Sequence, residues 1–143
     1  MAGRNPVGRQ LSIYVCEDDP QALALLREQL RALGHTPTLA KNAKTALVDL
    51  TFGAANYDLA IIDIDLPDLN GDKIVSWLRE SEEDSVRTLP ILIVTGQPDL
   101  LRVELLSAYD HCRLLMKPYS KEALARSLAA LIGKSDASTR KIH

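Results

Sequence analysis

Short apolar runs alternate along this chain of 143 residues with longer segments in which apolar residues recur at helical spacing. The runs have the length of buried strands, and the spacing in the longer segments is typical of helices with one buried face. The predicted strands cover residues 11–16, 36–40, 58–62, 91–95 and 113–116. The predicted helices cover residues 20–33, 42–52, 72–80, 98–108 and 120–132.

Residues with strong end preferences flank several of these helices. Asp19, which precedes a proline, and also Asn42 and Ser120 stand where an N-cap side chain is expected. Gly34 follows the first helix, as a C-terminal glycine should. The third helix is expected to fray into the charged stretch 82–84. The helix boundaries therefore rest on chemistry as well as on periodicity.

Five strand–helix units predict an α/β fold with a five-stranded, doubly wound parallel sheet and helices on both faces. Ligands of such sheets bind at the carboxyl ends of the strands, where the strand order reverses. If the order is 2-1-3-4-5, as in flavodoxin-like folds, the first and third strands are neighbours at that point. We expect one domain over residues 11–133, a flexible lead over 1–10 and a polar tail or linker start over 134–143.

Composition narrows the function classes. The chain is 46% hydrophobic and 25% charged, which is typical of one soluble globular domain. A net charge of −2 does not favour nucleic acid as a direct partner. Two cysteines predict reduced thiols in a cytoplasmic protein. No apolar stretch reaches the length of a membrane span, and residues 1–10 lack the apolar core of a signal peptide.

Chemically useful side chains follow four of the five predicted strands. Because the carboxyl ends of parallel strands meet at one edge of the sheet, these side chains should lie close together. They are Glu17 and Asp18 after the first strand, Asp63 and Asp65 after the third, Thr95 and Gly96 at the fourth, and Lys117 and Pro118 after the fifth.

Carboxylates that converge repel one another and need a counter-charge. A hard divalent cation with oxygen ligands such as Mg²⁺ would supply it. Lys117 adds a second positive charge, and Thr95 adds a hydroxyl. A metal and a lysine around one carboxylate make a site for a phosphoryl group, and the carboxylate can itself be the nucleophile.

Some of these acids have simpler explanations. Asp19 is explained as an N-cap and is left out of the site. Asp68 and Asn70 lie in a Pro/Gly turn, where turn chemistry accounts for them. Thr95 or Lys117 alone would be an ordinary strand residue or a solvated lysine. The four strand ends taken together are what favours a site.

The stretches "IYVCEDDP", "LAIIDIDLPDLNG", "ILIVTG" and "LLMKP" resemble, in order and approximate spacing, those of receiver domains of two-component response regulators. The resemblance covers about residues 10–133. It implies that Asp63 is the phospho-acceptor and a Mg²⁺ ligand, with Asp18 a direct ligand and Glu17 a ligand through water. It also implies that Asp65 binds the metal through its backbone carbonyl, so that its side chain could be dispensable.

The resemblance assigns the remaining strand ends to a switch. Thr95 resembles the hydroxyl that moves toward the phosphoryl group, and Gly96 the small residue that leaves room for it. Lys117 resembles the lysine that pairs with that group, and its bond to Pro118 is often cis in the family. One departure is Leu114, which stands where the family often has an aromatic ring that couples the switch to the output face.

The resemblance implies a phosphorylation-dependent signalling switch rather than an ordinary enzyme, although the chain takes part in its own phosphotransfer and dephosphorylation. The expected partners are a histidine kinase or histidine phosphotransfer protein and a downstream output protein or domain, with no nucleic acid and no membrane. A homodimer through residues 98–108, 113–116 and 120–132 is a further expectation. The chain could be a stand-alone receiver or one excised from a larger protein.

Two alternatives remain open from the sequence. A degenerate receiver would bind a partner without phosphorylation, and Leu114 is the one feature that favours it. A metal-dependent enzyme with a D-x-D strand tip, such as a haloacid dehalogenase-type phosphatase or a Toprim nucleic-acid enzyme, would also use Asp63 and Asp65. The early acids Glu17 and Asp18 do not fit the phosphatase, and Lys117 is not explained by the nucleic-acid enzyme.

Overall fold

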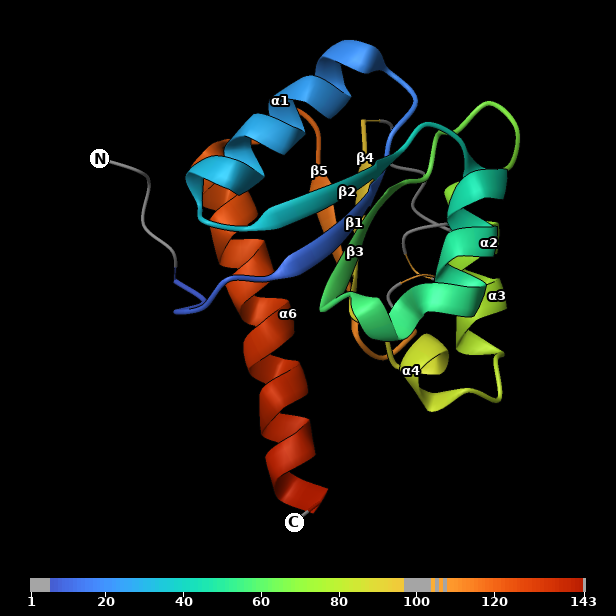
Figure 1. The fold of residues 1–143 in the computed structure, drawn as a ribbon, viewed down its shortest axis with the longest axis vertical. Helices are drawn as coiled ribbons and strands as arrows, with labels where there is room; N and C mark the ends of the chain where they lie inside the picture. Colours follow the sequence, from blue (N-terminus) through green and yellow to red (C-terminus); the bar gives the residue numbers. More distant parts are fainter. Residues whose placement is uncertain (1–5, 97–103, 105, 107, 143) are drawn as a thin grey trace.

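The computed structural model describes residues 6–96, 104, 106 and 108–142. Its centre is a parallel sheet of five strands in the order β2-β1-β3-β4-β5, which confirms the predicted fold class (Figure 1). The strands are β1 (Ser12–Cys16), β2 (Thr36–Ala40), β3 (Leu59–Asp63), β4 (Ile91–Thr95) and β5 (Cys112–Met116). The strand order reverses between β1 and β3, which are direct neighbours.

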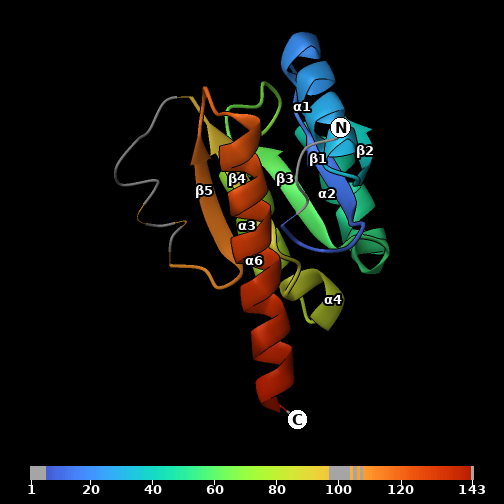
Figure 2. The same ribbon diagram turned by 90° about the vertical axis from the view of Figure 1, so that its left-hand side faces the viewer.

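Helices cover both faces of the sheet (Figures 1 and 2). One face carries α1 (Pro20–Ala32) and α6 (Lys121–Ile142). The other carries α2 (Ala43–Gly53), α3 (Gly71–Arg79), the short α4 (Asp84–Arg87) and a 3-10 turn, η1 (Ala54–Asn56). No described helix is both long and apolar enough to cross a membrane.

Alternate residues of each strand enter two separate cores. On β1, Ile13 and Val15 pack under α1 and α6, whereas Tyr14 and Cys16 pack under α2 and α3. All five residues of β3 are buried, as expected for a central strand covered on both faces. The sheet is therefore a rigid platform, and its carboxyl edge is the place where side chains can leave the core.

The predicted helix caps are confirmed. The side chains of Asp19 and Asn42 accept hydrogen bonds from the backbone of the first turns of α1 and α2, at 3.1 and 2.9 Å. Ser120 Oγ accepts from the N–H of Ala123 at 3.0 Å. Gly34 follows α1 with a φ of 91°, a conformation that costs glycine little.

The structure departs from the predicted helices in two places. The charged stretch after α3 is not only a frayed end, because it leads into the separate helix α4. The predicted end of the last helix at Ile132 is wrong, because α6 continues to Ile142 beyond the sheet (Figure 2). A packed helix extends at low cost where neither proline nor a cap stops it. The predicted helix 98–108 lies mostly outside the described residues, of which 104 and 106 are helical.

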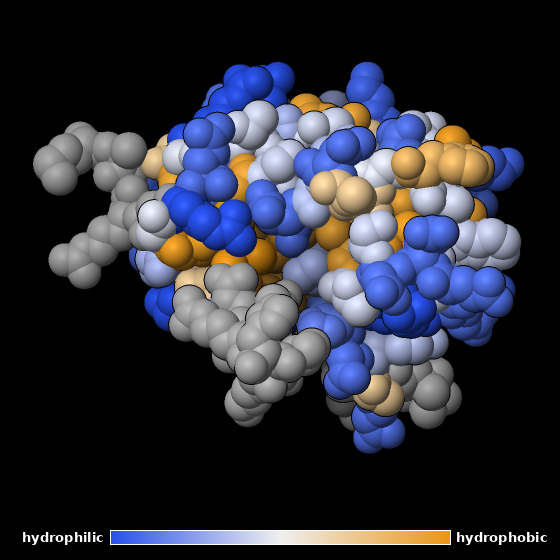
Figure 3. All heavy atoms as spheres, turned by 60° about the horizontal axis from the view of Figure 1, so that its bottom comes forward, coloured by the Kyte–Doolittle hydropathy of each residue, from blue (hydrophilic) through white to orange (hydrophobic). Residues whose placement is uncertain are grey.

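The surface at the end where α6 leaves the sheet is mainly hydrophilic, with apolar side chains in between (Figure 3).

At the start of β5 the guanidinium of Arg79 donates to the carbonyl oxygens of Arg87, Leu89, Asp110 and His111 at 2.8–3.1 Å. One side chain of α3 thus joins the segments after α4 and before β5. This clamp fixes the amino end of β5, the strand whose opposite end leads to Lys117.

Gly71 has no room for a side chain. A Cβ at this position would lie 2.5 Å from the carbonyl oxygen of Asp63 and 2.7 Å from Cα of Ile64. Its N–H donates to the carbonyl of Ile64 at 3.1 Å. The start of α3 therefore packs directly on the end of β3 and holds the intervening loop in place.

We expect opposite effects from the same substitution at two glycines. Gly71→Ala should destabilise the fold by about 2–3 kcal/mol, because the backbone atoms it would meet cannot move freely. Gly133→Ala, in α6 with nothing within 4 Å of its Cβ, should stabilise by about 0.5–1 kcal/mol. Urea unfolding of both variants measures these changes. Equal effects at the two positions would contradict this account of Gly71.

Candidate functional site

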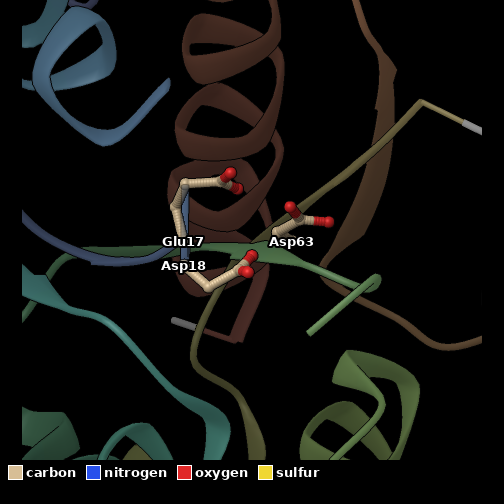
Figure 4. Close-up of side chains that lie close together, drawn as sticks. All are labelled: Glu17, Asp18 and Asp63. Atoms are coloured by element: carbon tan, nitrogen blue, oxygen red, sulfur yellow. The ribbon is translucent and has the colours of Figure 1, made fainter. Parts of the chain in front are cut away.

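Three carboxylates meet at the carboxyl ends of the two central strands. Glu17 and Asp18 directly follow β1, and Asp63 is the last residue of β3. One oxygen from each lies within 4.8 Å of the others, and Figure 4 shows the three groups close together. Glu17 and Asp63 are each only 4% exposed, whereas Asp18 is exposed. The cluster is thus buried on one side and open to solvent on the other.

Lys117 reaches this cluster from β5, across β4. Its backbone N–H donates to the carbonyl of Thr95 at 2.8 Å, which continues the pairing of the two strands. Its Nζ lies 2.9 Å from Asp63 Oδ2 and 3.2 Å from Glu17 Oε2. The Lys117–Pro118 peptide is cis. The structure therefore brings together the lysine and the acids that the sequence placed at the same edge.

The pKa values of the two buried carboxyl groups, Glu17 and Asp63, shift in opposite directions. Burial and hydrogen bonding with Asp63 raise the pKa of Glu17 to about 8, against the opposing effect of Lys117. Burial alone would raise the pKa of Asp63, but hydrogen bonds from Glu17, from the Asp65 N–H and from Lys117 hold it below its usual value. Burial would lower the pKa of Lys117, but the two acids raise it. The shared proton is therefore favoured on Glu17, and the negative charge on Asp63.

Asp65 and Thr95 are also in contact at this edge. The backbone N–H of Asp65 donates to Asp63 Oδ1 at 2.8 Å. The hydroxyl of the fully buried Thr95 donates to the exposed Asp65 at Oδ2, over 3.1 Å. The sequence did not predict this side-chain contact, because only the backbone of Asp65 was expected to matter.

Asp68, interpreted from the sequence as a turn residue, also has a wider structural role. Its two carboxylate oxygens accept from the N–H groups of Ala43 and Lys44, each at 3.0 Å. These hydrogen bonds hold the pKa of Asp68 below its usual value. The loop after β3 is thereby tied to the first turn of α2. No local sequence pattern could predict this tie, because its partners lie on another element.

The chemistry of the cluster fits a hard divalent cation. All its candidate ligand atoms are carboxylate oxygens, which Mg²⁺ prefers, and one of them is open to solvent. Burial and Asp63 raise the pKa of Glu17 even with Lys117 beside it, so the lysine alone does not fully offset the charge of the buried acids. A cation at Glu17, Asp18 and Asp63 would supply the missing positive charge.

Gly96 and Leu114 flank this edge. A Cβ on Gly96 would lie 3.7 Å from Cβ of Lys117, so only ordinary contact would limit a slightly larger residue there. Leu114 is partly buried against the core under α2 and α3. The role of a small residue at 96 and the effect of leucine at 114 both stay predictions.

Comparison with known proteins shows the family. The model of the response regulator receiver domain matches residues 13–129, so the chain belongs to this family. Membership of this family argues against the two enzyme classes with a D-x-D strand tip, the haloacid dehalogenase-type phosphatases and the Toprim nucleic-acid enzymes. The family assignment and the strand order agree with the predictions made from the sequence.

Its relatives are response regulators of several kinds. The chain is 28% identical over 123 residues to the two-component response regulator ARR11 of Arabidopsis thaliana, covering 86% of this chain but 22% of that protein. It is 27% identical to the polar-differentiation response regulator DivK of Brucella anthropi, covering 85% and 96% of the two chains. The chain spans only 15–50% of the length of ARR11, ARR10, RprY and ORR25.

Solved structures share the fold. The receiver domain of the sensor histidine kinase PA1611 of Pseudomonas aeruginosa is 28% identical, with a TM-score of 0.75, and the match covers 87% of this chain and 99% of that one. That protein has a magnesium ion coordinated in its active site cleft. A CheY-like receiver domain protein of Methanospirillum hungatei, 21% identical with a TM-score of 0.78, shows the same fold.

The raised pKa of Glu17 predicts a pH dependence for the metal-free protein. Because the folded state holds this proton more tightly than the unfolded state, its stabilising effect is complete below the unfolded pKa of 4.5. It is lost as pH rises through about 8. We expect the free energy of unfolding to fall between pH 5 and 8 by a few kcal/mol more in wild type than in Glu17→Gln, on the order of the linkage effect.

Urea unfolding at several pH values measures this difference. The lowered pKa of Asp63 acts below 3.8, outside this window. The lowered pKa of buried His35 acts below 6.5, and it is common to wild type and variant. The exposed Glu28→Gln is the control, and it should follow wild type. Parallel curves for wild type and Glu17→Gln would contradict the assignment of the proton.

Proposed function

We propose that this receiver domain is a phosphorylation-dependent signalling switch in a two-component phosphorelay, with Asp63 as the phospho-acceptor. One observation carries the proposal: the buried carboxyl group of Asp63 lies 2.9 Å from Lys117 Nζ and next to two further acids that suit a metal. The donor is a phosphohistidine on a histidine kinase or a histidine phosphotransfer protein.

The reaction is an in-line transfer between two nucleophiles. An oxygen of Asp63 attacks phosphorus, the new P–O bond forms and the P–N bond to the donor histidine breaks, leaving a neutral imidazole after proton uptake. Lys117 stays beside Asp63 and offsets the charge of the transferred group. The N–H of Asp65 holds Asp63 Oδ1 in place. The acyl phosphate is later lost to water, so that the switch resets.

Mg²⁺ would be held by Asp18 and Asp63 directly, by Glu17 through water and by the backbone carbonyl of Asp65. When bound, it supplies positive charge to the transferred phosphoryl group. The fit rests on the oxygen-only ligand set and on the carboxylates that Lys117 leaves uncompensated.

The readout would begin at Thr95 and Lys117, which are drawn toward the phosphoryl group after transfer. The surface of β5 and α6 would then shift between two arrangements that an output protein or domain reads. Residues 98–108, the remaining part of the predicted output surface, lie mostly outside the described residues. A homodimer through this surface is part of the proposal, as are a cytoplasmic location and the absence of direct contacts with nucleic acid or membrane. Leu114 would couple the two arrangements by packing, since it has no ring to rotate.

The receiver domain would comprise residues 11–133, preceded by a lead over 1–10 and followed by a linker start from 134. Residues 134–142 continue the helical backbone of α6. In the lead, Arg9 forms an ion pair of 3.4 Å with Asp58, and Val7 packs against the core under α1 and α6.

Phosphorylation is tested with a small phospho-donor such as acetyl phosphate. Wild type with Mg²⁺ should gain the mass of one phosphoryl group, and Asp63→Asn should gain none. Lys117→Met should slow the reaction by roughly 10²-fold, since removal of one preorganised positive group has effects of that order. Glu28→Gln, which neutralises an exposed acid of α1, should react as wild type does. Mass spectrometry measures all four, and phosphorylated Asp63→Asn would contradict the proposal.

Metal binding is tested by thermal unfolding with and without Mg²⁺. At a concentration about 100 times Kd, the ion should stabilise wild type by about 2.7 kcal/mol. Asp18→Asn should lose most of this gain, whereas Glu17→Gln should lose less, because Glu17 acts through water. Glu28→Gln should keep the full gain. An equal gain in Asp18→Asn and wild type would show that the ion binds elsewhere.

A further inference from the structure

The hydrogen bond from Thr95 to Asp65 joins the switch hydroxyl to a side chain that the family resemblance treats as dispensable. Thr95 is fully buried at the end of β4, and its Oγ1 lies 3.1 Å from Asp65 Oδ2. The hydroxyl of Thr95 is the donor in this hydrogen bond, and the carboxyl oxygen of Asp65 is the acceptor. In the unphosphorylated protein the proton of Thr95 is therefore directed at Asp65.

The backbone on both sides holds this contact in place. The N–H of Asp65 donates to Asp63 Oδ1 at 2.8 Å, and the N–H of Ile64 donates to the carbonyl of Val94 at 3.1 Å. Gly71, which packs on Asp63 and Ile64 without room for a Cβ, closes the loop. On the other partner, the carbonyl of Thr95 accepts from Lys117. Any change in the contact must come mainly from rotation of the two side chains.

A threonine hydroxyl has one proton to donate. When Asp63 carries a phosphoryl group, Thr95 cannot give this proton both to Asp65 and to a phosphoryl oxygen. Asp65 Oδ2 and the phosphoryl oxygen compete for this proton, so the hydrogen bond to Asp65 must break before the Thr95 hydroxyl can rotate toward the phosphoryl group. The contact thus favours the unphosphorylated arrangement by the free energy of one charge-assisted hydrogen bond.

We propose that Asp65 is a positioning residue whose carboxylate retains the Thr95 hydroxyl in the unphosphorylated arrangement. Asp65 thereby sets the free energy needed to move Thr95 toward the phosphoryl group when Asp63 is phosphorylated. This inference rests on the proposed function, because it assigns a regulator to the same site. It departs from the expectation that the side chain of Asp65 could be dispensable. Replacing the Asp65 carboxylate should not abolish the change of arrangement at Thr95 but should make that change more favourable.

The test measures the affinity for beryllium fluoride, a phosphoryl mimic, by fluorine NMR at saturating Mg²⁺. Removing the carboxylate in Asp65→Ala should tighten binding on the order of tenfold, as expected for loss of one hydrogen bond to a charged group. Asp65→Asn, which keeps an acceptor but not the charge, should lie between the two. Glu28→Ala changes the net charge equally on exposed α1 and should bind as wild type does.

A carboxylate near the mimic could also act by simple charge repulsion. A double-mutant cycle separates the two effects. In a Thr95→Val background the competing proton is gone, so Asp65→Ala should no longer change the affinity if the hydrogen bond is responsible. The same tightening in both backgrounds, or none in either, would overturn the proposal.

A second measurement needs no phosphoryl group. The χ1 rotamer of Thr95, read from three-bond couplings in the protein without mimic, should be single in wild type and mixed in Asp65→Ala. An unchanged rotamer would overturn the proposed retention. If wild type itself fails to bind the mimic, the proposed phosphorylation fails and the regulatory role of Asp65 fails with it. If wild type binds and Asp65→Ala binds equally, only the role of Asp65 fails.

Discussion

The ion pairs of Lys117 with Asp63 and Glu17 are the interaction on which the site depends. Two carboxyl groups that are each 4% exposed would be costly at the tips of adjacent strands without a positive charge beside them. The lysine can supply that charge only because β5 pairs with β4 in register and leaves the sheet at the correct level. The sheet order and the backbone hydrogen bond from Lys117 to Thr95 both contribute to that placement.

One lysine does not balance the whole cluster. Burial and Asp63 raise the pKa of Glu17, whereas the pKa of Asp63 is lowered. Of these two buried groups, Asp63 is therefore the one that ionises more readily, and further positive charge would stabilise both carboxylates. A cation and a phosphoryl group are complementary additions to such a site. The further contact between Thr95 and Asp65 then links the state of Asp63 to a buried hydroxyl of β4.

Much of the fold and of the candidate site could be predicted from the sequence. Both follow from the periodicity of apolar residues and from the meeting of parallel strand ends at one edge of the sheet. The strand order, the caps at Asp19 and Asn42, and the convergence of Asp63 with Lys117 are of this kind. The contact of Asp65 with Thr95 could not be predicted, since it depends on the path of a loop held by Gly71. The extension of α6 was missed because its polar continuation has no apolar periodicity.

The proposed phosphorylation makes Asp63 the nucleophile of a site that Lys117, Glu17 and Asp18 surround. The most direct test is phosphoryl transfer from a histidine-phosphorylated kinase or phosphotransfer protein, followed by reduction of the acyl phosphate with borohydride and peptide mapping. The account predicts that the reduced residue is found at position 63 and nowhere else. A label on another acid such as Asp18 or Asp65, or no transfer from any phosphohistidine donor while the protein remains folded, would contradict it.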